Sequence, residues 1–405
     1  MILSLAWRNL WRRRRRTIAS LTAIALTCVI VIFLPALQSG SYGAMIRSAN
    51  GLLDGYAQIQ RRDFLDKPAM RLSFSVNKTV SSAIAELPAG VQVVPRDISY
   101  ALLSSRKRSL GAQVMGVNAE LENRVSTIPG RIISGQYLHA DNHIVLGDAL
   151  ARNLQVNLGE TVDMLGMARD GSLAVDVLTV AGIFRTGMRE LDRQLVQIKL
   201  ARFDQTFAMQ GQRHALVIGS NTDAALLHQA VTTLERSLSG TGLVVHDWKK
   251  LQAGVYYSIQ LDMVSGIFMY LILIVIVTAS LLNNMMMSAM ERTREFGMMM
   301  ALGVKPGLLG RIVWTEIVLM SGLGTLLGML LGSAITLWYS VNGLHFESVQ
   351  AVFEQFGMSS TLYPELTPLT LLAGPAVVAG SLILAGLAPV YRLFHLQIIA
   401  AMRSV

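Results

Sequence analysis

His139, Asp141 and His143 are the residues whose types and spacing most readily suggest chemistry, because imidazole and carboxylate groups are common metal ligands. A stable site would need further ligands, and none is close in the sequence. The other histidines are scattered along the chain. We therefore expect a polar turn at 139–143 and no bound metal.

Glu190, Asp192 and Arg193 form a second charged group that could exchange protons in an acid–base reaction. A solvated turn or a structural ion pair is the more common use of such a group. The sequence contains no G-x-x-x-x-G-K-[ST] phosphate loop, no H-E-x-x-H zinc motif and no G-x-S-x-G nucleophile turn. These absences predict a chain that is not an enzyme by itself, with no catalytic residues and no bound cofactor.

The composition indicates a membrane protein with a soluble part. Hydrophobic residues make up 52% and charged residues only 15%, whereas ordinary soluble domains have about 25% charged residues. The formal net charge of +9 could suit nucleic acid or anionic lipid, but six arginines, Arg8 and those at 12–16, lie directly before an apolar run. That placement is typical of a membrane flank, so we expect no nucleic-acid partner.

Four stretches lack charged residues over about the 20 residues that a bilayer crossing requires. They run from Ile18 to Leu37, from Met263 to Leu282, from Ile317 to Leu337 and from Leu369 to Leu387. The first is longer than a signal-peptide core of about 7–15 residues and has no following Ala-x-Ala site, so we expect a retained helix. The absence of charge in all four argues against an ion or hydrophilic-solute pathway.

The third stretch contains Gly324, Gly328 and Gly332, which form two overlapping G-x-x-x-G units. Small residues at this spacing allow helix backbones to approach closely. The spacing leaves two interpretations open, which are packing of spans three and four within the chain, or a seam between two subunits. The single cysteine, Cys28, precludes an intrachain disulfide.

Lysine and arginine placement predicts the orientation. Basic residues occur before span one, between spans two and three and after span four, whereas 338–368 has none. Both termini and 285–311 should therefore be cytoplasmic, and 38–262 should be outside. Leu3, Trp7, Leu10 and Trp11 recur at helical spacing, which predicts an amphipathic helix in 1–16 that packs on lipid or on other protein.

The segment between spans one and two predicts an α+β domain. Two strand–helix–strand patterns occupy 57–61, 78–87 and a strand from 91, and then 215–219, 223–238 and 243–246. Asn221 and Asp223 suit a helix start, and Gly240 and Gly242 suit its end. Split βαβ pairs of this kind build ferredoxin-like layers. Predicted strands at 113–117, 161–165, 175–184 and 195–200, with a helix at 147–153, indicate a β-rich insert.

The stretch from Ser288 to Gly303, SAMERTREFGMMMALG, resembles the E-R-x-x-E-[FI]-G-x-x-x-A-x-G stretch of the ABC permease family that includes MacB, LolC, LolE and FtsX. Leu5-Ala-Trp-Arg-Asn-Leu-Trp-Arg also resembles the start of these proteins, and so does Gly182-Ile-Phe-Arg-Thr-Gly with Glu190-Leu-Asp-Arg. The order of one span, a large domain and three spans covers essentially the whole chain.

The resemblance implies a permease subunit that pairs with a second one, as a homodimer or heterodimer, and docks on cytosolic ATPase subunits that hold ATP and Mg. It implies that the coupling helix at the ATPase contains Glu291, Arg292, Arg294, Glu295, Phe296, Gly297, Met300, Leu302 and Gly303. Glu291 and Glu295, four residues apart, would share one face of that helix. The outer domain would be a porter-like unit with an insert, moved through stiff helices continuous with spans one and two. Membrane lipid and a periplasmic adaptor or lipoprotein are further implied partners.

With no ATPase sequence before Met1, we expect the chain to lie nearest the lipoprotein-release permeases of an inner membrane, extracting or exporting amphipathic cargo. The alternative is an FtsX-like scaffold that activates a cell-wall hydrolase and moves nothing. The expected layout is an amphipathic helix at 1–16, spans at 17–37, 259–284, 312–339 and 369–390, an outer domain at 38–258 (porter-like 55–112 and 201–247, insert 113–200), a cytoplasmic loop at 285–311, an outer loop at 340–368 and a cytoplasmic tail at 391–405.

Overall fold

The computed structural model describes residues 2–12, 14–219, 224–345 and 361–394. The chain divides into two compact units. The helical unit contains the residues up to Gly43, those from Gln260 to His345 and those from Thr361 onward, and the α+β domain contains Ala44–Ile259. The expected helix start at Asn221 and Asp223, and the tail at 395–405, lie outside the described residues.

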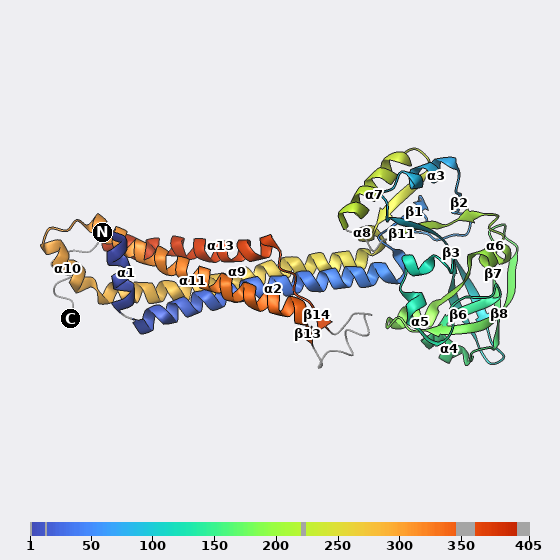
Figure 1. The fold of residues 1–405 in the computed structure, drawn as a ribbon, viewed down its shortest axis with the longest axis horizontal. Coiled ribbons are helices and arrows are strands. Elements are labelled where there is room, and N and C mark those ends of the chain that lie inside the picture. Colours follow the sequence, from blue (N-terminus) through green and yellow to red (C-terminus); the bar gives the residue numbers. More distant parts are fainter. Residues whose placement is uncertain (1, 13, 220–223, 346–360, 395–405) are drawn as a thin grey trace. The chain divides into compact units, whose positions relative to one another are not determined.

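Seven helices are described in the helical unit or enter it (Figure 1). They are α1 (Ile2–Arg12), α2 (Arg14–Ala49), α9 (Ala253–Glu291), α10 (Thr293–Ala301), α11 (Pro306–Asn342), α13 (Pro368–Ala385) and α14 (Leu387–Phe394). Short strands β13 (Leu344–His345) and β14 (Thr361–Leu362) pair after α11. Among the described residues, four helical segments are long and apolar enough to cross a membrane, as the sequence predicted: Arg14–Asp54, Ala253–Glu291, Pro306–Asn342 and Pro368–Arg392.

Local sequence sets several helix ends. Pro306 and Pro368 occupy the first turns of α11 and α13, where a missing N–H costs no hydrogen bond. Thr367 caps α13 through its hydroxyl, which accepts a hydrogen bond from the Thr370 N–H at 3.2 Å. The expected end of the amphipathic helix at 16 is wrong, because α2 already begins at Arg14.

The glycine ridge of α11 packs against α2, so both interpretations considered for it are wrong. A Cβ at Gly324 would lie 2.8 Å from Ile24 Cβ, and one at Gly328 would lie 2.4 Å from Cys28 Cβ. Gly332 faces Ile32 in the same way, at 3.1 Å from its Cδ1. The small residues therefore bring span three against span one of the same chain.

The α+β domain contains these described elements, in chain order: η1 (Asn50–Asp54), β1 (Ala57–Arg61), β2 (Phe74–Ser75), α3 (Lys78–Ala85), β3 (Gln92–Ser104), β4 (Ser109–Val117), η2 (Glu122–Arg124), η3 (Ile128–Arg131), β5 (Ile132–Gly135), β6 (His143–Gly147), α4 (Asp148–Leu154), β7 (Thr161–Met167), β8 (Leu173–Phe184), α5 (Arg189–Gln194), β9 (Leu195–Lys199), α6 (Leu200–Thr206), β10 (Gln212–Arg213), β11 (Ala215–Gly219), α7 (Ala224–Ser237), β12 (Leu243–Asp247) and α8 (Trp248–Leu251).

The ferredoxin-like half is confirmed. Strands follow the order β12-β1-β11-β3, with antiparallel neighbours. Helices α3 and α7 pack against each other and bury Val80 and Leu234 over Ile59 and Leu216. Alternating apolar residues and clear turn signals made these strands readable from the sequence.

The predicted borders of the insert at 112/113 and 200/201 are wrong, because each falls within an element. Strand β4 runs through 112/113, and α6 runs through 200/201. Leu103 of β3, Phe203 of α6 and Phe207 directly after α6 belong to the same buried core as Val114 and Leu178. The sheet continues through β4, β9, β6, β8 and β5, so the insert extends the porter-like sheet instead of forming a separate layer.

Candidate functional site

The expected coupling stretch is divided between two helices. Glu291 is the last residue of α9, Arg292 precedes α10, and α10 ends at Ala301 before Gly303 adopts a φ of 91°. The expectation that Glu291 and Glu295 share one helix face is therefore wrong. A positive φ at Gly303 is accessible to glycine at little cost, which suits it to the turn into α11.

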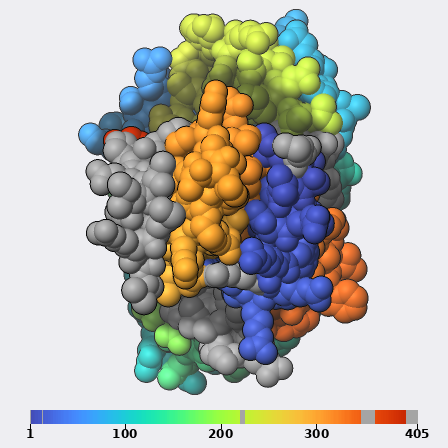
Figure 2. Space-filling model, turned by 90° about the vertical axis from the view of Figure 1, so that its left-hand side faces the viewer, coloured from blue at the N-terminus to red at the C-terminus, as the bar shows by residue number. Residues whose placement is uncertain are grey.

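Helix α10 has a buried face and an exposed face. Phe296, Gly297 and Met300 are buried and belong to the inner side of the helix. Met298 is 50% exposed and Leu302 is 86% exposed. Figure 2 shows this segment in orange on the molecular surface beside the blue N-terminal helix. Met298 of α10 and Leu302 directly after it are thus exposed apolar side chains beside the buried face of the helix.

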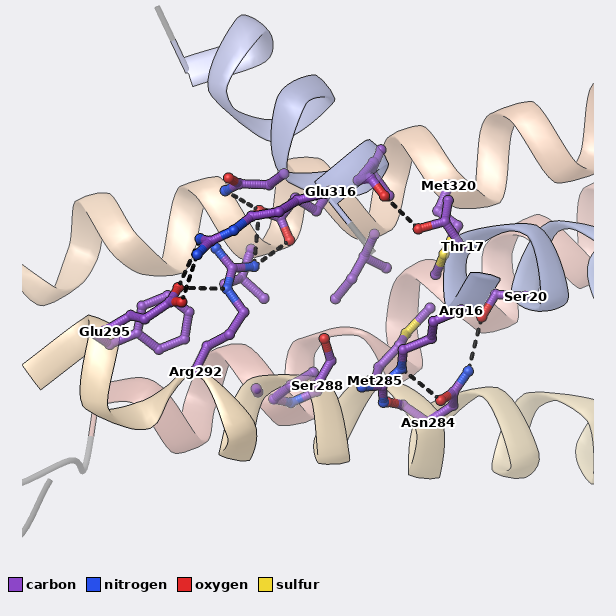
Figure 3. A pocket seen from close by; sticks show the side chains of 18 residues that line it. Arg16, Thr17, Ser20, Asn284, Met285, Ser288, Arg292, Glu295, Glu316 and Met320 are labelled. Carbon is purple, nitrogen blue, oxygen red and sulfur yellow. Dashed lines mark hydrogen bonds and ion pairs between the residues drawn. The ribbon is translucent and has the colours of Figure 1, made fainter. Parts of the chain in front are cut away.

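The carboxylate of Glu316, a residue of α11, connects three helices (Figure 3). Its Oε1 accepts a hydrogen bond from Asn9 Nδ2 of α1 at 2.7 Å. Arg292 Nη1 donates to both carboxylate oxygens, at 3.2 and 2.9 Å. The side chains of Arg292 and Glu316 are each 15% exposed, so this charge-assisted pair is largely removed from solvent.

Glu295 provides a contact between α10 and α1. It lies 3.3 Å from Arg12 of α1 and 3.6 Å from Arg292 Nε. The Arg292 guanidinium also lies 5.0 Å from the centre of the Phe296 ring, within the range of a cation–π contact. Arg292 thereby links the start of α10 to α11, and Glu295 links α10 to α1.

A neighbouring polar cluster joins α2 to α9. Arg16 Nε donates to Asn284 Oδ1 at 2.9 Å, and Arg16 also pairs with Glu291 at 3.1 Å. Asn284 Nδ2 in turn donates to Ser20 Oγ at 2.9 Å. Together with the Glu316 cluster these groups line a cavity of about 290 Å³, whose apolar wall includes Met285 and Met320 (Figure 3).

The structure divides the expected site residues into three groups. Arg292, Glu295, Phe296, Gly297 and Met300 hold α10 in place. Arg294 is exposed on α10, and Leu302 and Gly303 are exposed directly after it. Glu291 is exposed but pairs with Arg16, and the three glycines at 324, 328 and 332 belong to the α2–α11 contact.

Sequence reasoning missed Glu316, Asn284 and Asn9. Glu316 immediately precedes the apolar run from 317 and lies within the predicted span at 312–339. An isolated carboxylate at the edge of a span requires a partner, and this could have indicated a functional position. Its pairing with Arg292 could not be read from the sequence, because the two residues belong to different helices.

The other chemical candidates have structural roles. Asp141 forms an ion pair with Lys199 at 3.1 Å, and His143 begins β6. Within the described ranges, no group of three or more His, Cys, Asp or Glu residues is arranged to hold a metal. The expected solvated turn or ion pair is wrong for Asp192, which is buried and accepts hydrogen bonds from the Thr186 N–H and hydroxyl at 2.8 and 2.7 Å.

Two family models match the chain. The MacB-like periplasmic core domain matches residues 17–234, and the FtsX-like permease C-terminal region matches residues 267–398. The first match covers more than half of the chain, and the second contains α10, most of α9, α11 and α13.

Curated relatives include a lipoprotein-releasing system transmembrane protein LolC of Xylella fastidiosa, 26% identical over 248 residues, with 59% of each chain covered. The macrolide export ATP-binding/permease protein MacB of Sodalis glossinidius is 25% identical over 353 residues, covering 81% of this chain and 51% of that protein. The chain thus spans between about half and three fifths of the length of these relatives.

Among solved structures, the periplasmic region of MacB from Actinobacillus actinomycetemcomitans matches with 12% identity and a TM-score of 0.36, covering 52% of this chain and 95% of that one. The family assignment rests on the two sequence models and confirms the resemblance seen in the sequence. The chain belongs to the MacB/LolC/FtsX family of ABC-transporter permeases, with a MacB-like periplasmic core domain and an FtsX-like permease region.

Proposed function

We propose that this chain is the permease subunit of an ATP-driven complex whose ATP-hydrolysing subunit is a separate cytosolic protein. The observation that carries the proposal is the geometry of α10. Its inner face is held by Phe296, Met300 and the Arg292–Glu316 pair, while Met298 and Leu302 are exposed. A partner bound to the exposed face of α10 would move α10 together with α1 and α11, the helices that contact it.

We further propose that two such subunits assemble, and that the complex takes a lipoprotein or another amphipathic cargo from the membrane. The uncharged central parts of the four spans support this part of the proposal, since a hydrophilic solute would need polar groups along its path. The name of the LolC relative, a lipoprotein-releasing protein, is consistent with it.

The proposal is tested by purifying the intact chain from its own membranes in mild detergent and identifying the recovered proteins. We expect a nucleotide-binding ATPase and a second permease subunit, with ATP and Mg bound by the ATPase. Leu302→Asp should recover much less ATPase, while Leu173→Asp, at a residue of the α+β domain that is 74% exposed, should not.

Three results would contradict parts of this proposal. ATP hydrolysis by the purified chain alone would remove the need for a partner ATPase. Full recovery of the ATPase with the Leu302→Asp variant would show that the ATPase does not dock at α10. If ATP turnover by the reconstituted complex activated a cell-wall hydrolase and released no lipoprotein, the chain would be a signalling scaffold and the cargo proposal would fail.

A further inference from the structure

Arg96 and Glu122 form a fully buried ion pair in the α+β domain. The Arg96 side chain is 2% exposed and the Glu122 side chain is 0% exposed, and an Arg96 Nη2 donates to Glu122 Oε1. Burial raises the pKa of the Glu122 carboxyl, and the nearby Arg96 charge acts in the opposite direction. Removing two charges from water is expensive, and apolar residues of similar volume often stabilise a fold at least as well. Stability alone therefore does not explain this pair.

The second hydrogen bond of Arg96 reaches the segment that follows α2. Its Nη1 donates to the carbonyl of Leu53 in η1. The segment that carries Glu122 also returns to η1, through Ser126 Oγ, which donates to the Leu52 carbonyl at 2.7 Å. Two independent groups near the ion pair thus hold the peptide groups of η1.

The same place receives the segment that precedes α9. Gln252, the residue directly before α9, donates its side-chain amide to Asp54 Oδ2 in η1. Gln58 of β1 donates to the Asp54 carbonyl at 2.9 Å and to Oδ1 at 3.3 Å. The segment that follows α2 and the residue that precedes α9 therefore meet at one polar cluster, in which Arg96, Glu122 and Gln58 are buried and Asp54 and Gln252 are partly buried.

We propose that this cluster is the joint that fastens the ends of α2 and α9 to the central sheet of the α+β domain. Arg96 is its positioning residue, because it lies on β3, the strand that links the porter-like strands to the insert. A displacement of either helix end would then be delivered to β3. The consequence for transport rests on the proposed function, whereas the joint itself does not.

The joint is tested first without any partner, by amide hydrogen exchange on the full chain in detergent. Arg96→Met combined with Glu122→Leu removes both charges and keeps similar side-chain volume. We expect a melting temperature close to that of the unchanged chain, but at least about fivefold faster exchange at 50–54 and 248–252, since local opening sets exchange rates.

The matched control is Arg202→Met with Asp176→Leu, which removes an ion pair between α6 and β8 whose Asp176 side chain is 3% exposed. We expect this control to leave exchange at 50–54 and 248–252 unchanged. Unchanged exchange in the Arg96/Glu122 variant would overturn the proposal. Equally faster exchange throughout the domain would also overturn it, because the pair would then serve general stability.

The second test uses the complex with its ATPase. The Arg96/Glu122 variant should keep ATP turnover within about twofold of the unchanged complex while ATP-dependent cargo release falls at least about tenfold, a loss equivalent to about 1.4 kcal/mol. Undiminished release would overturn the role in transmission. If the unchanged chain bound no ATPase, the proposed function would fail, but the exchange experiment would still decide whether the joint exists.

Discussion

At the scale of single residues, Glu316 connects the helices around α10. One carboxylate accepts hydrogen bonds from α1 and from Arg292, the residue directly before α10, while its own backbone belongs to α11. Its removal would leave the Arg292 guanidinium largely buried and without its main counter-charge. Loss of one partner from a buried pair is more damaging than loss of both.

We predict that Glu316→Ala destabilises the chain by on the order of 3 kcal/mol and lowers its melting temperature. Arg292→Glu should be similarly harmful. The double reversal, Glu316→Arg with Arg292→Glu, should recover a large part of the loss, since opposite charges again face each other. Thermal unfolding in detergent measures all three, and failure of the double reversal to exceed either single variant would contradict a direct pairing.

Asp176 allows a pH prediction for the α+β domain. Burial by itself would raise the pKa of its carboxyl, but hydrogen bonds from Arg202 and Thr206, both at 2.7 Å, outweigh burial and leave the pKa below its usual range. A lowered pKa in the folded state contributes stability above the unfolded pKa of about 3.9, and the contribution is lost as the pH falls through the lower folded value.

We therefore expect Asp176→Asn to lower the unfolding temperature of the chain at neutral pH and to matter progressively less as the pH falls below about 4. Asp163→Asn is the matched control, because this carboxylate is exposed on β7, the strand paired with β8. Thermal scans at a series of pH values would check it. A penalty for Asp176→Asn that grew toward acid pH would contradict the assignment.

At the scale of elements, helix α11 packs by its small residues. Gly328 has no room for a side chain, since a Cβ there would lie 2.4 Å from Cys28 Cβ and 2.7 Å from the Ala25 carbonyl oxygen. Gly322, on the exposed side of the same helix, has nothing within 4 Å of such an atom. Both glycines lie within the same helix, but Gly328 faces α2 and Gly322 faces no other described residue.

We predict that Gly328→Val costs about 1–3 kcal/mol or displaces α11 from α2, because overpacking forces backbone shifts. Gly322→Val should be close to neutral, and it corrects for the helix propensity of valine. The comparison is made by unfolding temperature and by cross-linking of cysteines placed across the α2–α11 contact. Equal effects at both positions would mean that α2 does not lie on this ridge.

The sequence predicts whole elements well where one periodicity dominates. The four apolar runs became helices, and β1 and β11 have the predicted bounds, because hydrophobic content and alternation identify each from local residues. Strands β5 and β6 were not predicted, and their place beside β8 is set by pairing between distant residues, which local patterns do not show. The partner of the glycine ridge was missed for the same reason, since spacing shows that a close contact exists but not with which helix.

At the scale of the whole molecule, α2 and α9 are the elements that both units share. In the helical unit they are tied at Arg16–Asn284 and again where Asp262 accepts hydrogen bonds from Gln38 at 2.8 Å and from Tyr42 at 2.6 Å. In the α+β domain their ends meet at Asp54 and Gln252. The sequence predicted continuous stiff helices from a resemblance, but these polar contacts lie between distant residues and required the structure.

Every functional proposal requires α10 and the α+β domain to face opposite sides of the membrane, and this topology is the final prediction. Lysine and arginine flank span one, occupy the loop that contains α10 and follow span four, whereas the loop after α11 has none. Short loops rich in these residues are disfavoured for translocation, while long segments cross largely regardless of charge. We therefore expect α10 inside and the α+β domain outside.

Single cysteines introduced after Cys28→Ala can be probed in intact cells with a membrane-impermeant thiol reagent. The exposed Ser172 and Tyr363, the latter 52% exposed, should label as cysteines, whereas Leu302 and Met298 should label only after the cells are opened. Labelling after the cells are opened shows that the two inner positions are accessible to the reagent. A lack of labelling in sealed cells then reports only the side of the membrane on which they lie. Labelling of Leu302→Cys in sealed cells would place α10 outside, where no cytosolic ATPase could reach it.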